Sequence, residues 1–119
     1  MKNILSPAPF KWVSGQSLNS SFTSPMIEVL AYYGLFIQAN VTSAASLNGS
    51  LAVQYSADGV NWINAPTDAS LAVNPKPLTA TGSVAWEYPK IISYNYMRLS
   101  YTWTAGTGAM DVYLAGVRV

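Results

Sequence analysis

Apolar and polar residues alternate with a period of two along most of this chain, and no other feature constrains its fold as strongly. The alternation is sustained over residues 34–43, 51–57, 95–104 and 109–119. A β-strand that buries one face produces this pattern, whereas an amphipathic helix repeats every 3.6 residues. We therefore predict an all-β fold, an antiparallel β-sandwich with almost no helix. In the first of these strands one face carries Leu35, Ile37, Ala39 and Val41, and the other carries Phe36, Gln38, Asn40 and Thr42.

The clearest local signal is a hairpin that follows the strand at 51–57. Asp58 and Gly59 supply its turn, because glycine adopts a positive φ without steric cost, and Trp62 begins the return strand. Asp58 also suggests a calcium ligand. A calcium site needs several oxygen ligands, however, and a lone aspartate beside a turn glycine is more typical of an Asx turn. We predict the turn and no metal site.

Weaker signals place the remaining elements. Two more strands are predicted at 26–33 and 83–88, and small polar residues at 43–49 indicate a loop. Three prolines in 65–82 predict a long connection or an irregular edge strand. Residues 105–108 contain two glycines and predict the hairpin turn between the last two strands.

The first 25 residues differ from the rest of the chain. They hold three prolines and a run rich in serine and asparagine, which predict an extended N-terminal arm (1–25) ahead of a β-sandwich domain (26–119). Phe10 and Trp12 are the candidate interface anchors of this arm. We expect them to dock on the same domain or on a neighbouring copy. A short strand is predicted at 10–13. We favour an attachment role for the arm, and a frayed terminus is the alternative.

The composition offers little catalytic chemistry. The chain has no histidine, no cysteine and only 9% charged residues, which excludes Ser–His and Cys–His nucleophiles. Glu87 and Asp111 are the pair that a glycosidase would need, but solvated or ion-paired surface carboxylates are far commoner. We expect a protein that is not an enzyme, with no catalytic, cofactor-binding or metal-binding residues. Arg98 lies mid-strand and is predicted to hold a carboxylate such as Glu87 or Asp111, fixing the sheet register.

Charge and hydropathy limit the classes of partner that the chain is expected to bind. Six basic and five acidic residues are scattered and give a net charge of +1, so the electrostatic footprint of a nucleic-acid-binding protein is missing. No window approaches the roughly 18 apolar residues of a membrane-spanning helix, and the N-terminal apolar stretch is too short for a signal peptide. We expect no nucleic-acid or membrane partner. Weak self-repulsion favours association, so we expect a homo-oligomer, a trimer or a dimer.

Aromatic residues make up 13% of the chain and raise a second possibility. Tyr94, Tyr96 and Trp103 are the candidate aromatic surface on which a glycan would stack. Aromatic side chains also fill sandwich cores and subunit interfaces, and this is their commoner role. A glycan is therefore a second candidate partner, in addition to other copies of the chain.

Two stretches resemble known families. The segment 51–62 (LAVQYSADGVNW) resembles a hairpin of discoidin-like jelly rolls. The segment 96–102 (YMRLSYT), followed by Gly-Thr-Gly at 106–108, resembles the final hairpin of small β-sandwich proteins in tailed-phage virions. The resemblance implies a sandwich of the jelly-roll type and a structural role as a symmetric oligomer that decorates capsids or builds fibres. It also implies a major capsid protein or another virion protein as the partner.

These observations lead to one expectation and one alternative. We expect a non-enzymatic bacteriophage virion structural protein, a capsid decoration or cement protein that assembles as a homo-oligomer. Such a protein is made in the host cytoplasm and ends in the virion. The alternative is a carbohydrate-binding or receptor-binding β-sandwich module.

Overall fold

The computed structural model describes residues 3–4, 10–30, 32–66 and 73–118. The predicted all-β class is confirmed, because these residues form nine strands and no helix, and the strands pair antiparallel. This part of the chain therefore contains no helix long and apolar enough to cross a membrane. In chain order the strands are β1 (Asn3–Ile4), β2 (Phe10–Ser17), β3 (Phe22–Thr23), β4 (Ile27–Glu28), β5 (Tyr32–Ser56), β6 (Ile63–Asn64), β7 (Lys76–Leu78), β8 (Gly82–Ile91) and β9 (Tyr96–Arg118).

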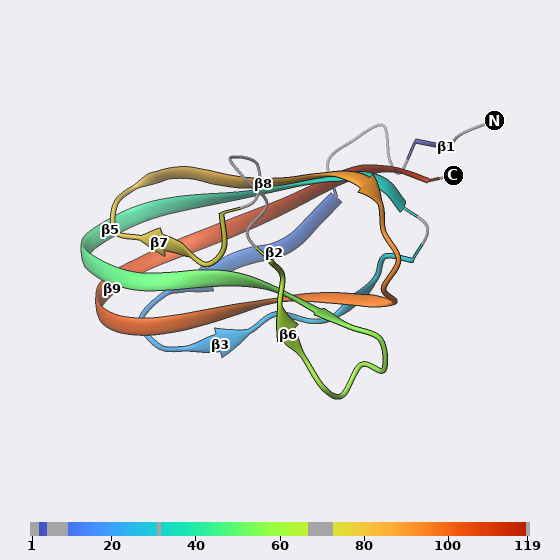
Figure 1. Ribbon diagram of the computed structural model, residues 1–119. Helices are drawn as coiled ribbons and strands as arrows, with labels where there is room; N and C mark the ends of the chain where they lie inside the picture. The colour runs from blue at the N-terminus through green and yellow to red at the C-terminus, as the bar shows by residue number, and fades with distance from the viewer. Residues whose placement is uncertain (1–2, 5–9, 31, 67–72, 119) are drawn as a thin grey trace.

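Two long strands, β5 and β9, form the frame of the molecule. They pair along almost their whole length, from Tyr32 opposite Arg118 to Ser56 opposite Tyr96. Both strands bend midway at one end of the molecule, and β1 lies at the opposite end beside the last residues of β9 (Figure 1). Because the paired ribbon folds over on itself, its two halves come to lie in two facing layers.

The bend requires backbone that most residues avoid. Ser43 and Ser46 on β5 have φ of 55° and 51°, and Gly106 on β9 has φ of 83°. A Cβ atom at position 106 would collide with the backbone of Ser46, so both the conformation and the close approach select glycine there. The loop predicted at 43–49 and the hairpin turn predicted at 105–108 are therefore wrong, because each strand continues through its bend into the other layer.

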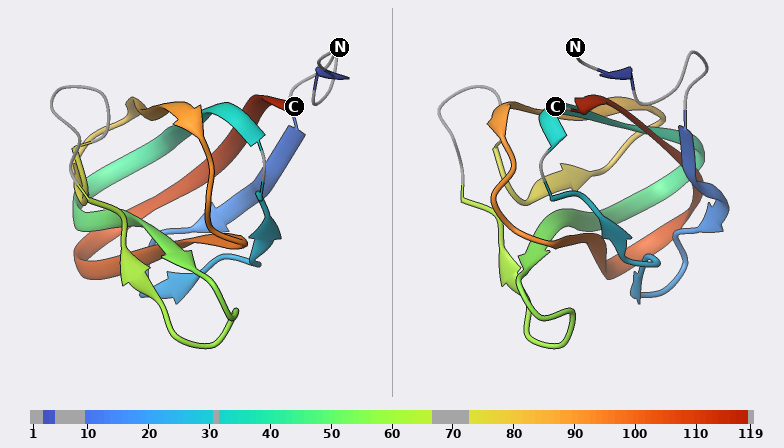
Figure 2. Two further views of the ribbon diagram at one scale, coloured as in Figure 1. Left: turned by 45° about the vertical axis from the view of Figure 1, so that its right-hand side comes forward. Right: turned by 90° about the vertical axis from the view of Figure 1, so that its right-hand side faces the viewer.

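The two layers have a jelly-roll strand order. Sheet I consists of β2, the second half of β9 (109–118), the first half of β5 (32–42) and β8. Sheet II consists of β3 and β4, the first half of β9 (96–103), the second half of β5 (49–56), and β6 with β7. Along the chain the strands alternate between the sheets as I, II, I, II, II, I, II, I, which confirms the predicted jelly-roll topology (Figure 2).

Side chains that point between the sheets form the core. Residues directly opposite each other share a face, so sheet I contributes the row Trp86, Ile37 and Leu114, and sheet II contributes Val53 and Leu99. Each of these five is at most 3% exposed. The outer face of each sheet is consequently built from the alternate residues of the same strands.

Residues 10–24 belong to this sandwich. β2 and β3 both pair with β9, and Trp12, Val13 and Leu18 are buried in the core. Register shifts on both sides of Val13 turn two successive side chains inward. The short strand predicted at 10–13 is present and extends to Ser17. These residues are therefore strands of the sandwich and not a free arm. Residues 1–2 and 5–9 of the predicted arm lie outside the described residues.

Candidate functional site

The outer face of sheet I carries a hollow of about 410 Å³. Strand register builds it, because Gln38 lies opposite Tyr113 while Phe36 lies opposite Ala115 on the neighbouring strand. The short side chain of Ala115 leaves room between the larger groups around it. The hollow is lined by Phe36, Gln38, Asn40, Tyr113, Leu114 and Ala115.

Hydrogen bonds orient the amides of this hollow. Gln38 Nε2 donates to Asn40 Oδ1 at 2.9 Å, and the Ser83 hydroxyl donates to the same oxygen at 2.7 Å. The bonds link β5 to β8, where Asn40 lies opposite Ser83. These bonds hold both amide groups in place. They do not use the Nδ2 atom of Asn40 or the Oε1 atom of Gln38.

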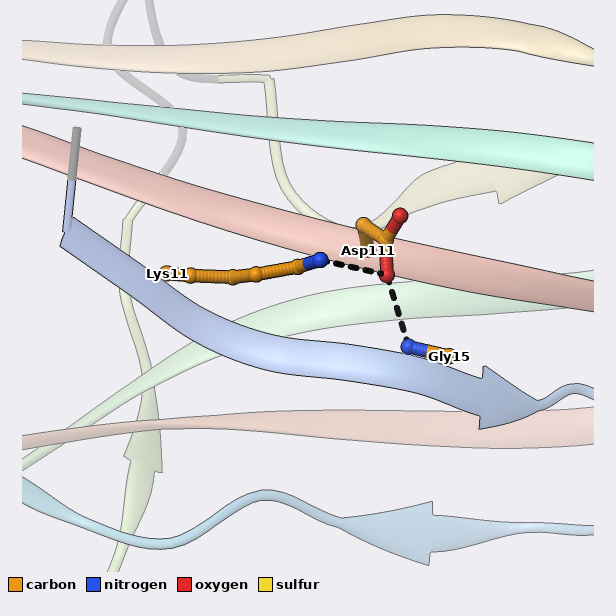
Figure 3. Close-up of polar contacts among 3 residues, drawn as sticks. All are labelled: Lys11, Gly15 and Asp111. Carbon is orange, nitrogen blue, oxygen red and sulfur yellow. Dashed lines mark hydrogen bonds and ion pairs between the residues drawn. The ribbon is translucent and has the colours of Figure 1, made fainter.

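A charged pair borders the same face. Lys11 Nζ lies 3.6 Å from Asp111 Oδ1, and the Gly15 N–H donates to that oxygen at 2.6 Å (Figure 3). Lys11 Nζ also lies 5.7 Å from the centre of the Tyr113 ring. Because both charged side chains are partly exposed, the ion pair contributes less than about 1 kcal/mol. Its main effect is to tie β2 to β9 where their register shifts.

The two carboxylates considered for catalysis are far apart. Asp111 lies opposite Asn40 and Glu87 lies opposite Phe36, so both face outward from sheet I with β5 between them. Ordinary strand spacing then separates them by about 16 Å, beyond the roughly 6.5–9.5 Å of an inverting glycosidase pair. Among the described residues, no three carboxylate, imidazole or thiolate side chains are grouped so that they could hold a metal ion.

The two predicted interface anchors lie in different environments. Trp12 is 8% exposed, and its Nε1 donates to the Pro25 carbonyl at 3.0 Å. Its indole is part of the chain's own core, which is the first of the two expected dockings, on the same domain. Phe10 is 45% exposed and lies beside a smaller hollow of about 170 Å³ that Ile27, Glu28, Tyr32 and Leu114 also line.

The predicted aromatic surface is not one platform. Tyr94 stacks on Tyr55 with ring centres 3.6 Å apart, and burial raises the pKa of its hydroxyl. Tyr96 and Trp103 lie seven positions apart on β9, which is about 23 Å along a strand. Trp103 is exposed, and its Nε1 donates to the Gly106 carbonyl at 3.0 Å. The structure therefore does not bring Tyr94, Tyr96 and Trp103 together.

The Asp58 turn has the predicted Asx geometry. Oδ1 of Asp58 accepts the N–H groups of Val60 and Asn61, each at 2.9 Å, and Gly59 has φ of 74°. These donors favour the carboxylate and lower the pKa of Asp58 well below its usual value. β5 and β6 pair on either side of the turn, which confirms the hairpin.

Among the described residues, Arg98 pairs with an amide and an indole and not with a carboxylate. Its Nε donates to Gln54 Oε1 at 2.7 Å, and its guanidinium lies 4.4 Å from the centre of the Trp62 ring. The predicted partners Glu87 and Asp111 are on sheet I, whereas Arg98 is on sheet II. The prediction was wrong because the fold decides which strands lie beside Arg98. Alternation along its own strand does not contain that information.

The residues of the hollow were not among the predicted site residues. Alternation had placed Phe36, Gln38 and Asn40 on one face of the strand 34–43, so part of the signal was present. Tyr113 joins them only through the pairing of β5 with β9, across more than 70 residues of chain. That pairing has no local signature in the sequence.

Comparisons with known proteins show a shared fold. The SPBc2 prophage-derived protein YomS matches with a TM-score of 0.61 and 8% identity, over 98% of this chain and 95% of that one. A chain in the structure of infectious bursal disease virus, Gx strain, matches with a TM-score of 0.53 and 12% identity, over 98% of this chain and 32% of that one. No protein-family model and no curated protein matches the chain.

The class that fold and comparisons define is thus a jelly-roll domain whose structural neighbours include a prophage-derived protein and a chain of a virus structure. At 8% and 12% identity the likeness concerns the fold. What the protein does must be argued from its own surfaces.

Proposed function

We propose that the protein is a non-enzymatic structural component of a bacteriophage virion, a capsid decoration or cement protein that assembles as a homo-oligomer. The observation that carries this proposal is the likeness to a prophage-derived protein, which spans nearly the whole of both chains. A second likeness, to a chain of a virus structure, supports it. Fold alone does not fix function, so the proposal also draws on the surface.

The surface supports association. Eight large apolar side chains of the described residues are exposed, while the whole sequence carries only 9% charged residues. Net charge near zero leaves copies free to approach each other. We propose Phe10 as a contact residue, because its side chain is exposed. Phe10 is the first residue of β2, and β2 begins at the end of the sandwich away from the bends (Figure 1). The proposed partners are a second copy of the chain and a major capsid or other virion protein.

The proposal is tested on virions. Particles are purified through a density gradient from a lysate in which the gene is expressed, and their proteins are quantified by mass spectrometry. We expect the chain to remain with the particles in a fixed ratio to the major capsid protein. Loss of the chain from purified particles, with the capsid protein retained, would contradict a structural role.

Oligomeric state is measured separately by sedimentation equilibrium of the purified chain. We expect a dimer or a trimer, and we expect Phe10→Ala to weaken self-association. Ser14→Ala changes an exposed polar residue of the same strand, β2, and serves as the control. A monomer that also fails to bind particles would count against decoration.

A further inference from the structure

The hollow on the outer face of sheet I has the properties of a ligand site. Its volume of about 410 Å³ falls within the roughly 300–1,000 Å³ of small-molecule sites. No charged side chain is among the residues that line it. Aromatic groups and amides converge there, which is the combination typical of a site that orients a ligand by a few polar contacts.

The amides offer both kinds of hydrogen bond side by side. Asn40 Oδ1 already accepts two bonds, from Gln38 Nε2 and from the Ser83 hydroxyl. The Nδ2 donors of Asn40 and the Oε1 acceptor of Gln38 therefore remain for a ligand. Neighbouring hydroxyl groups on one ring each donate and accept, so they match this pair. An anion would use only the donors and a cation only the acceptor.

The aromatic groups supply the apolar half of the site. Phe36 is 41% exposed, and Tyr113 lies diagonally from it across the paired strands. Lys11 Nζ, near the Tyr113 ring, is paired with Asp111 and stands outside the lining. An exposed ring beside hydrogen-bonding amides suits a ligand with one apolar face and polar edges.

We propose that this hollow binds a neutral oligosaccharide, with sugar-ring C–H groups on Phe36 and Tyr113 and hydroxyl groups on Gln38 and Asn40. A sugar ring presents both kinds of surface, apolar C–H groups on its face and hydroxyl groups at its edge. A second copy of the chain is the competing occupant. A dry protein contact would leave the amide donors and acceptor buried without partners, which disfavours such a contact. The proposal is independent of incorporation into a virion.

The test uses the full chain, labelled with ¹⁵N and titrated with cellohexaose, maltohexaose and chitohexaose in turn. We expect at least one of these sugars to cause saturable chemical-shift changes at Tyr113, Ala115 and the side-chain amides of Gln38 and Asn40. Phe36→Ala and Gln38→Met should each weaken this binding about tenfold, the equivalent of about 1.4 kcal/mol. Both side chains point away from the core, and thermal melts check that each variant folds.

Ile63→Ala is the control, since Ile63 is an exposed apolar residue (67%) on sheet II that does not line the hollow. It should leave sugar binding unchanged. Absence of saturable changes on this face with all three sugars overturns the proposal, and so does equal binding by Phe36→Ala. If Phe36→Ala instead lowers the oligomeric state in sedimentation without sugar, the face is an interface between copies and the saccharide proposal fails. Virion incorporation can succeed or fail separately from each of these results.

Discussion

Truncating Trp12 tests whether β2 is part of the folded sandwich. The indole is 8% exposed, and its Nε1 donates to the Pro25 carbonyl at 3.0 Å. Trp12→Ala removes this burial and the hydrogen bond together. If residues 10–24 were a detachable arm, the same change would leave the stability of the domain unaltered.

The size of the effect follows from the buried area. A tryptophan buries about 200 Å², and at about 25 cal/mol per Å² this stabilises the fold by about 5 kcal/mol. Partial collapse of the cavity reduces the loss, and Trp→Ala changes in cores cost about 3–5 kcal/mol. We expect a loss in that range. It is a large fraction of the roughly 5–15 kcal/mol that holds a domain of this size folded.

The assay is urea unfolding followed by tryptophan fluorescence and circular dichroism. With a slope of about 2 kcal/mol per molar urea, the midpoint should fall by about 2 M. Phe10→Ala, on the same strand but half exposed, should shift it by less than half as much. Equal midpoints for Trp12→Ala and the parent chain would refute the assignment of β2 to the core.

Three further predictions concern the turns and the bend. Gly59→Val should destabilise the fold by about 1–3 kcal/mol, because a β-branched residue is strained at φ of 74°, and the melting midpoint measures this. Gly106→Val should cost about 3 kcal/mol or more, since its Cβ would also meet the backbone of Ser46, and an unchanged midpoint would mean that the bend is built differently. The folded state lowers the pKa of Asp58, so the stability it contributes is present above the unfolded pKa of about 3.9 and is lost as pH falls. The difference in melting midpoint between the parent chain and Asp58→Ala should therefore shrink between neutral pH and about pH 3, and a constant difference would contradict the linkage.

Local patterns predicted the elements whose cause is local. The apolar face of the strand 34–43 was predicted from alternation, and its members Leu35, Ile37, Ala39 and Val41 are buried. The Asp58–Gly59 turn was predicted from its own residues, because the carboxylate and the positive φ act within a few positions. Such features need no knowledge of the rest of the fold.

Features set by distant pairing were not predictable in the same way. The polar segments at 43–49 and 105–108 have the composition of turns, but they lie opposite each other and bend together as one ribbon. Arg98 contacts Gln54 and Trp62 because β9, β5 and the hairpin that contains Asp58 lie next to each other on sheet II. The hollow likewise depends on Tyr113 pairing with Gln38. In each case the topology of the fold determines which distant residue makes the contact.

Rebinding to particles tests the proposed structural role most directly. Particles are prepared from a phage that lacks the gene, mixed with increasing amounts of the purified chain, and sedimented. We expect saturable binding at a fixed number of copies per capsid protein, weakened by Phe10→Ala and unaffected by Gln38→Met. Failure of the chain to sediment with such particles at any concentration would contradict a decoration or cement function.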